Sequence, residues 1–171
     1  MKSLVAYFSH AGENYGVNET KIGNGKYIAD FLMELTNSDE FEIKTIKEYP
    51  FGYDDCCDVA KLEKNNHERP ELSRYLDNLD QYATIYLVYP MWWGTCPMAV
   101  FTFLEHNSFK DKKIYLFSTH EGSGFGESIV DVANTIPNAV VKEGLAIYGH
   151  EAKESKNMIE KWLDEHENRW S

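Results

Sequence analysis

Apolar positions along the chain form short runs that alternate with stripes at helical spacing. Four runs are apolar at consecutive positions, which is typical of parallel strands that helices cover on both faces. They are residues 4–8, 83–89, 114–117 and 145–148. A fifth run, residues 41–46, alternates between apolar and polar positions and therefore fits an edge strand with one wet face.

Five segments between and after these runs carry apolar residues at helical spacing. They are Tyr27, Ile28, Phe31, Leu32 and Leu35; Leu72, Tyr75, Leu76 and Leu79; Val100, Phe101 and Leu104 after Pro97; Ile129, Ala133 and Ile136; and Met158, Ile159, Trp162 and Leu163. Asn37 marks the end of the first helix, and residues 47–70 fit a loop followed by a short helix. This alternation predicts a doubly wound α/β fold that forms one domain over residues 1–171.

Composition and charge narrow the class of protein. The 171 residues are 43% apolar and carry a net charge of −11, which argues against nucleic acid and anionic lipid as main partners. Three cysteines, of which Cys56 and Cys57 are adjacent, make no disulfide framework, so we expect a reducing, cytoplasmic setting. No apolar run approaches the ~18 residues of a spanning helix, so we expect neither membrane insertion nor an export segment.

Glycine, hydroxyl and aromatic residues follow three of the predicted strands, in residues 9–14 with 23–26, in 90–95 and in 118–126. Ligands of open parallel sheets bind beyond the carboxyl ends of the strands, where the strand order reverses. Glycines at a helix start bind phosphate through free N–H groups, and Ser9, Asn24 and Lys26 add donors and charge. Trp92 and Trp93 offer a stacking plane, so the pattern indicates a flat, phosphorylated ligand.

Each of these features also has an ordinary structural interpretation. Glycines near a strand end are often simple turns, and neither a dinucleotide fingerprint nor a Walker loop has the spacing found here. Trp92 and Trp93 could be core or interface anchors, and His120 could be a hydrogen-bonding loop residue. The acidic cluster of residues 54–58 fits a solvated helix start better than a metal site.

Four motifs together resemble the flavodoxins, in particular a group with a Trp-Trp-Gly loop. They are Tyr7-Phe8-Ser9, Gly23-Asn24, the segment of residues 89–95 and the Thr-His-Glu-Gly-Ser-Gly segment of residues 119–124. The resemblance covers nearly the whole chain, and the last two segments are its most specific parts. It implies an open sheet of five parallel strands in the order 2-1-3-4-5, three α/β/α layers, and noncovalently bound FMN.

The resemblance also implies a role for individual residues in binding FMN. Those expected to hold the phosphate are Ser9, His10, Asn24, Gly25 and Lys26; those expected to flank the isoalloxazine are Pro90, Met91, Trp92, Trp93, Gly94 and Thr95; those expected to line its pyrimidine side are Thr119, His120, Glu121, Gly122, Ser123 and Gly124. Ala11 and Gly25 stand where Ser or Thr is usual, and residues 12–22 look inserted. We expect Lys26, or Asn14 and Tyr15 from the insertion, to replace the lost donors.

The sequence leaves three functions open. The leading interpretation is an FMN-binding electron-transfer protein that serves a redox partner protein or a small electron acceptor. The alternatives are an FMN-dependent NAD(P)H:quinone-type reductase and a flavin-less binding module that kept the fold. No side chain is predicted to act as an acid, base, nucleophile or metal ligand, since the flavin would carry the chemistry. Whether the chain forms a homodimer stays open.

Overall fold

Five parallel strands form one sheet in the order β4-β1-β5-β6-β7. The computed structural model describes residues 1–14 and 17–167, and the side chains of residues 13, 14 and 17–20 lie outside that description. The strands are β1 (Lys2–Tyr7), β4 (Asp39–Glu42), β5 (Tyr82–Pro90), β6 (Lys113–His120) and β7 (Val140–Tyr148). This is the predicted 2-1-3-4-5 order, so the predicted fold class is confirmed.

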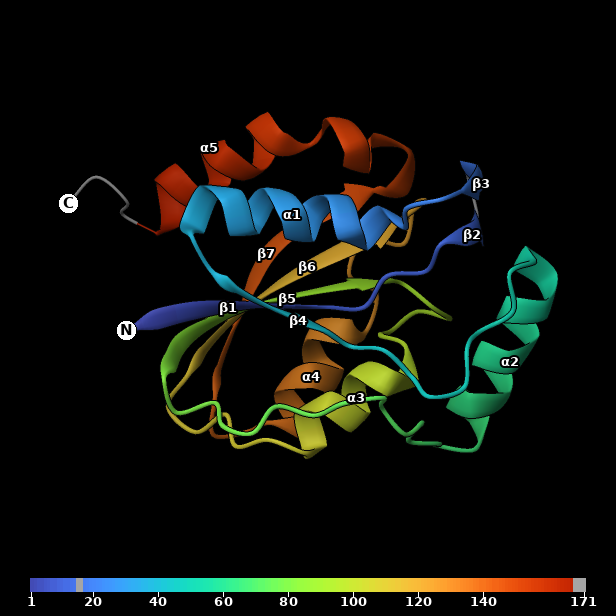
Figure 1. The fold of residues 1–171 in the computed structure, drawn as a ribbon, viewed down its shortest axis with the longest axis horizontal. Helices are drawn as coiled ribbons and strands as arrows, with labels where there is room; N and C mark the ends of the chain where they lie inside the picture. Colours follow the sequence, from blue (N-terminus) through green and yellow to red (C-terminus); the bar gives the residue numbers. More distant parts are fainter. Residues whose placement is uncertain (15–16, 168–171) are drawn as a thin grey trace.

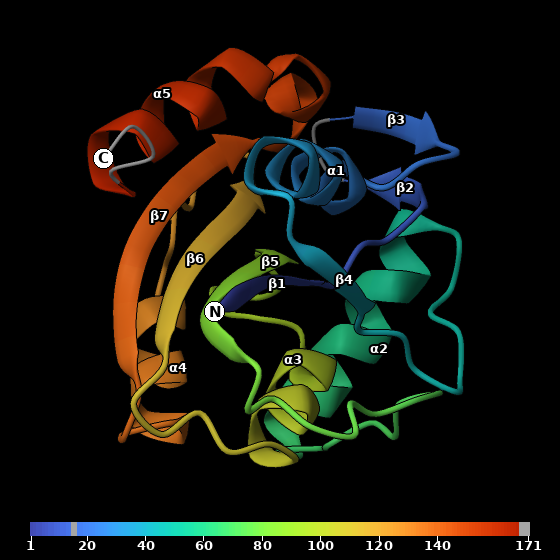
Figure 2. The same cartoon turned by 60° about the vertical axis from the view of Figure 1, so that its left-hand side comes forward.

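Helices cover both faces of this sheet (Figure 1). The helices α1 (Asn24–Thr36) and α5 (Lys156–His166) lie on one face, and α3 (Met98–Glu105) and α4 (Ser128–Thr135) lie on the other. A 3-10 turn, η1 (Gly149–Glu154), leads from β7 into α5. Both views place α2 (Tyr53–Asn65) beyond the carboxyl end of β1, on the same side as the hairpin of β2 (Gly12–Asn14) and β3 (Val17–Thr20) (Figures 1 and 2).

The absence of alternation in the central strands follows from this two-sided cover. Along β1, Leu4 and Ala6 face the core that includes α3, whereas Val5 and Tyr7 face the core beneath α1 and α5. Because successive side chains of a strand point to opposite faces, a strand between two helical layers is apolar throughout. Burial of both faces therefore holds β1, β5 and β6 at the centre of the sheet.

Two sequence-based predictions about elements are wrong. Residues 72–79 form no helix; Ser73 N–H instead donates to the carbonyl group of Lys44 (2.7 Å), and Leu72 pairs with Thr45 in an isolated antiparallel bridge. The apolar residues of this segment still enter the core, so helical spacing here reflects burial and not helical hydrogen bonding. Tyr148 was expected to be covered on a two-sided strand, but β7 is the sheet edge and leaves it 43% exposed.

No helix within residues 1–14 and 17–167 combines the length and the apolar character that crossing a membrane would need.

The edge strand β7 contains a bulge that depends on a glycine. Leu116 of β6 pairs with Glu143 and Phe117 pairs with Leu145, which leaves Gly144 as the extra residue. A Cβ on Gly144 would lie 2.5 Å from the carbonyl oxygen of Leu116 and 2.9 Å from the Phe117 ring. We expect Gly144→Ala to lower the free energy of unfolding by about 1–3 kcal/mol, the usual cost of overpacking.

Urea denaturation followed by circular dichroism measures this change. The matched control is Glu143→Ala, which alters the exposed neighbouring residue and should change stability by less than about 0.5 kcal/mol. Equal stability of Gly144→Ala and the wild-type protein would contradict the role assigned to the bulge.

Candidate functional site

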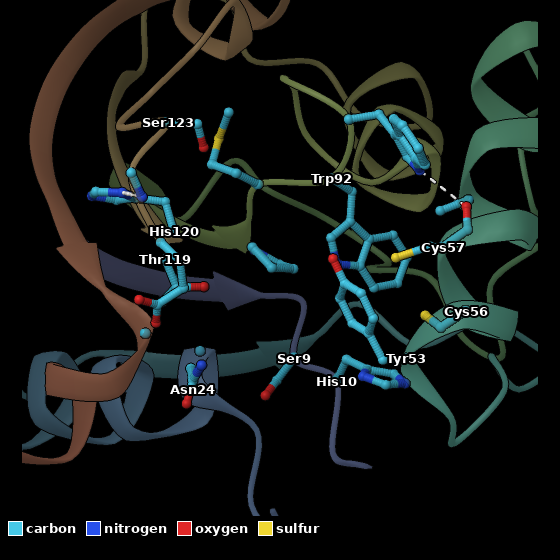
Figure 3. A pocket seen from close by; sticks show the side chains of 18 of the residues that line it. Ser9, His10, Asn24, Tyr53, Cys56, Cys57, Trp92, Thr119, His120 and Ser123 are labelled. Atoms are coloured by element: carbon cyan, nitrogen blue, oxygen red, sulfur yellow. Dashed lines mark hydrogen bonds between the residues drawn. The ribbon is translucent and has the colours of Figure 1, made fainter. Parts of the chain in front are cut away.

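A cavity of about 810 Å³ lies at the carboxyl ends of β1, β5 and β6. The strand order reverses between β1 and β5, so the cavity occupies the position where open α/β sheets bind ligands. Its lining residues are Ser9, His10, Asn24, Gly25, Tyr53, Asp54, Cys56, Cys57, Asp58, Ala60, Pro90, Met91, Trp92, Trp93, Thr119, His120, Glu121, Gly122, Ser123 and Gly149. Figure 3 shows Ser9 and Asn24 at one end, His120 and Ser123 along one side, and Trp92 facing α2.

One end of the cavity is formed by the start of α1. The helix begins at Asn24, and Gly23 provides no side-chain cap. Ser9 Oγ accepts a hydrogen bond from Lys26 N–H (3.2 Å), so the hydroxyl lies at the mouth of the helix. A Cβ on Gly25 would lie 2.8 Å from the carbonyl oxygen of Phe8, so glycine permits the helix to begin this close to the end of β1. The free N–H groups and the positive end of the helix dipole suit an anion here.

Several predicted site residues lie outside the cavity lining. The Lys26 ammonium is 2.8 Å from the Asp30 carboxylate and 3.4 Å from Glu40. The Thr95 hydroxyl is buried and donates to Asp131 (2.6 Å).

Gly94 and Gly124 are also absent from the lining, although both shape the neighbouring loops. The Gly94 carbonyl accepts from Glu127 N–H (2.8 Å), and the Gly124 carbonyl accepts from the Ser118 hydroxyl (2.8 Å). Asn14 and Tyr15 cannot be placed, because the Asn14 side chain and the whole of Tyr15 lie outside the described residues. The other predicted residues are brought together around one cavity.

The two neighbouring tryptophans have different surroundings. The Trp92 ring is packed edge-to-face against Tyr49 (4.9 Å between centroids) and Phe8 (5.1 Å), and it forms part of the cavity wall. Trp93 has φ = 55° in a tight turn closed by a hydrogen bond from Trp92 N–H to the carbonyl of Thr95 (2.9 Å), and it is 46% exposed. The turn therefore directs the two rings to different places.

Trp93 attaches the turn to α2. Its indole N–H donates to the carbonyl of Cys57 (3.0 Å), and its own carbonyl accepts from the Lys64 ammonium (2.5 Å). The Lys61 ammonium lies 5.1 Å from the centre of the indole ring, within the range of a cation–π contact. These three contacts connect α2 to the Trp92-Trp93 loop.

No sequence pattern predicts that α2 forms a wall of the cavity. The six lining residues of this wall are Tyr53, Asp54, Cys56, Cys57, Asp58 and Ala60. The helix was expected, but local spacing says nothing about which part of the sheet a helix will face. A second attachment holds this wall, since the Tyr49 hydroxyl donates to the Glu63 carboxylate (2.6 Å). Burial raises the pKa of Glu63, although the Tyr49 hydrogen bond opposes that shift.

The opposite wall is built from the glycine-rich loop after β6. His120 Nδ1 accepts from Gly122 N–H (2.9 Å), so the ring closes the start of this loop. Glu121 accepts from His150 N–H (2.9 Å), and its other oxygen lies 2.6 Å from His150 Nδ1, which ties the loop to η1. Gly122 has φ = 138° with open space around its Cβ position, so its backbone is accessible beside the cavity.

Comparisons with known proteins point in one direction. A family model described as flavodoxin matches residues 2–166. The chain is similar to a candidate flavoprotein from Bacteroides eggerthii, with 27% identity, a TM-score of 0.77, and coverage of 95% of this chain and 96% of that one. A candidate flavoprotein from Bacteroides uniformis gives 24% identity and a TM-score of 0.78, with 95% and 97% covered.

A flavoprotein from Lactobacillus acidophilus, whose structure was solved in complex with FMN, shares the fold at 20% identity. Its TM-score is 0.64, and 90% of this chain and 97% of that chain are covered. No curated protein matches the chain significantly.

The attachment of α2 through Trp93 is testable in the protein without added ligand. Trp93→Ala removes the indole N–H bond and the Lys61 contact, which together are worth roughly 1–2 kcal/mol. We expect amide hydrogen exchange in α2 to rise about tenfold, while exchange in α1 stays unchanged. Trp93→Phe is the matched control, because it keeps an aromatic ring above Lys61 and should give a smaller rise. Unchanged exchange in α2 of Trp93→Ala would show that the helix is held by other contacts.

Proposed function

Because the chain belongs to the flavodoxin family, we propose that the cavity binds FMN noncovalently and that the protein transfers electrons through this cofactor. FMN would supply the electron-accepting and electron-donating chemistry, and the chain would hold and orient it. The observation that carries this proposal is a single cavity that joins a helix N-terminus to an aromatic wall across the switch point of the sheet.

The donors at the start of α1 fit the phosphate of FMN. Ser9 and Asn24 offer side-chain donors beside the N–H groups of the first turn of α1, and this turn carries no acidic residue. Gly149 leaves room for the Asn24 side chain, because a Cβ at position 149 would lie 2.6 Å from the amide nitrogen of Asn24. We assign no phosphate contact to Lys26, because its ammonium group pairs with Asp30 and Glu40.

The loops after β5 and β6 fit the ring of FMN. Trp92 presents aromatic surface from one side, and the accessible backbone of Gly122 and Ser123 lies along the other. Backbone groups of this kind can hydrogen-bond the polar edge of a flat heterocycle. The residues that we propose to hold FMN are Ser9, Asn24, Gly25, Pro90, Met91, Trp92, Thr119, His120, Gly122 and Ser123.

An absorption spectrum with added FMN tests the proposal. We expect the flavin bands to shift on binding, and we expect dithionite or a reduced partner protein to bleach them without air. Rapid bleaching by NADPH alone would favour a reductase, and the absence of binding at excess FMN would leave a flavin-less module. The three described cysteines are free thiols, and this supports the proposal that the protein works in the reducing environment of the cytoplasm.

The proposed phosphate site predicts a difference between FMN and riboflavin. Asn24→Asp places a carboxylate at the start of α1, where it suits the helix dipole but repels a phosphate. We expect FMN affinity to fall at least about tenfold, a change of about 1.4 kcal/mol. Riboflavin, which lacks the phosphate, serves as the control and should bind the variant and the wild-type protein alike. An equal loss of affinity for FMN and riboflavin would show that the phosphate does not bind beside Asn24.

The aromatic wall makes a second prediction about affinity. Trp92→Ala removes ring surface from the cavity and should weaken FMN binding by about 1–3 kcal/mol. Trp93→Phe is the control, since Trp93 is directed toward α2 and its loss of the N–H group should leave FMN affinity within about twofold of wild type. Isothermal titration with FMN measures both. Full affinity in Trp92→Ala would discredit the contact between this ring and the flavin.

A further inference from the structure

We propose that the α2 side of the cavity is an acceptor pocket, which binds a small, flat electron acceptor without negative charge, such as a quinone, and disfavours nicotinamide dinucleotides. The acceptor pocket is formed by Tyr53, Asp54, Cys56, Cys57, Asp58 and Ala60 of α2, opposite Trp92. This inference rests on the proposed binding of FMN, because the flavin would occupy the strand-end side of the same cavity.

The cavity has room for a second molecule beside the cofactor. Its volume of about 810 Å³ is near the upper end of the roughly 300–1,000 Å³ found for small-molecule sites. None of the six α2 residues belongs to the loops that we assign to FMN, and α2 lies beyond the carboxyl ends of the strands. An acceptor held against α2 would therefore lie next to the flavin without displacing it.

The aromatic and small residues of the acceptor pocket suit a flat ring. Tyr53 offers an aromatic face, and Ala60 with the two thiols keeps the rest of the α2 wall small. Burial raises the pKa of the Cys56 thiol to about 12, with smaller contributions from Cys57 and Glu63, so this sulfur stays neutral. The wall thus combines aromatic and small apolar groups, as sites for quinone-like molecules require.

The charges around the acceptor pocket disfavour an anion. Asp54 and Asp58 are four residues apart on one face of α2, and both line the cavity. Among the described lining residues there is no lysine or arginine. The two cations nearest along the helix are engaged by Trp93, with Lys61 over its ring and Lys64 on its carbonyl.

A nicotinamide dinucleotide needs a place for its diphosphate. Helix starts are common diphosphate sites, but the start of α1 is assigned to FMN and the start of α2 already carries Asp54 and Asp55. The lining histidines make local contacts: His10 Nε2 lies 2.9 Å from the carbonyl oxygen of Pro50, and His120 Nδ1 accepts from Gly122 N–H. The geometry therefore selects acceptors by charge as well as by shape.

The acceptor pocket would support the two-electron reduction of a quinone to a hydroquinone. Bound FMN in its reduced form would supply a hydride equivalent to a quinone held against α2 and would thereby become oxidised, and one proton from solvent would complete the hydroquinone. Because a nicotinamide donor is disfavoured, the cofactor would be reduced again by two one-electron transfers from a separate donor protein, with one proton taken from solvent.

Reoxidation rates of the FMN-loaded protein test the charge selection. The protein is reduced with stoichiometric dithionite and mixed anaerobically with duroquinone, which is neutral, or with 2,6-dichlorophenolindophenol, which is a flat anion. We expect Asp54→Asn/Asp58→Asn to raise the rate for the anion on the order of fivefold at low salt and to change the duroquinone rate by less than about twofold. The matched control is Glu48→Gln/Glu68→Gln, which removes two exposed charges that neither line the cavity nor lie at the start of α2.

Protection of Cys57 from alkylation tests the position of the bound acceptor independently of turnover. Cys57 is partly exposed and lines the acceptor pocket, whereas Cys56 and Cys96 are buried. We expect iodoacetamide to label Cys57 in the oxidised, FMN-loaded protein. Saturating duroquinone should slow this labelling at least about threefold, and the same concentration of NADPH should not. Duroquinone suits the experiment because its four methyl groups block thiol addition. Peptide mass spectrometry gives the extent of labelling.

The outcomes separate the two proposals. Failure of FMN to bind overturns the proposed function and, with it, the acceptor pocket. FMN binding together with equal responses of the two double variants overturns the charge selection. FMN binding together with rapid bleaching by NADPH, or with no protection of Cys57 by duroquinone, overturns the acceptor pocket and leaves the flavin site standing. Slow bleaching by NADPH, protection of Cys57 and a selective response of Asp54→Asn/Asp58→Asn support the inference.

Discussion

The start of α1 lies directly against the residues that follow β1, and the shape of the cavity depends on this contact. Two glycines make it possible. A Cβ on Gly25 would lie 2.8 Å from the Phe8 carbonyl oxygen, and a Cβ on Gly23 would lie 2.7 Å from the His10 carbonyl oxygen. A larger residue at either position would push the helix outward, and the N–H groups of its first turn would leave the end of the cavity. Position 25 therefore lacks the hydroxyl group that Ser or Thr would offer, and in its place the backbone itself comes close to an anion.

In the turn after β5, the adjacent residues Trp92 and Trp93 contact different walls of the cavity. Positive φ angles at Trp93 and Gly94 turn the chain sharply, so that Trp92 enters an aromatic cluster with Phe8 and Tyr49 while Trp93 reaches Cys57 on α2. The turn thereby fixes the strand-end loop and the α2 wall relative to each other. A tryptophan in a left-handed backbone conformation is uncommon, and the contacts of its ring and carbonyl with α2 account for its presence here.

The sequence predicts the parts of this structure that depend on local pattern and strand order. The buried strands, the start and end of α1 and the glycine-rich loops follow from consecutive apolar residues, from Asn37 and from the position of each loop after a strand. The errors arise where long-range contacts decide. Leu72 pairs with Thr45 and not with its own helical turn. The position of α2 over the cavity is of the same kind, because it depends on contacts with Tyr49 and Trp93 that no local pattern contains.

The glycine bulge in β7 has a consequence for the solubility of the protein. An edge strand exposes unpaired backbone groups to which a strand of another molecule could add, and such addition leads to aggregation. In β7 the bulge at Gly144 interrupts the regular spacing of those groups, and the exposed charges of Lys142 and Glu143 stand beside the interruption. A strand approaching this edge would meet a kinked backbone and charged side chains that it could not pair in register. The residue that allows β6 and β7 to pack closely therefore also keeps the sheet from growing into a neighbouring molecule.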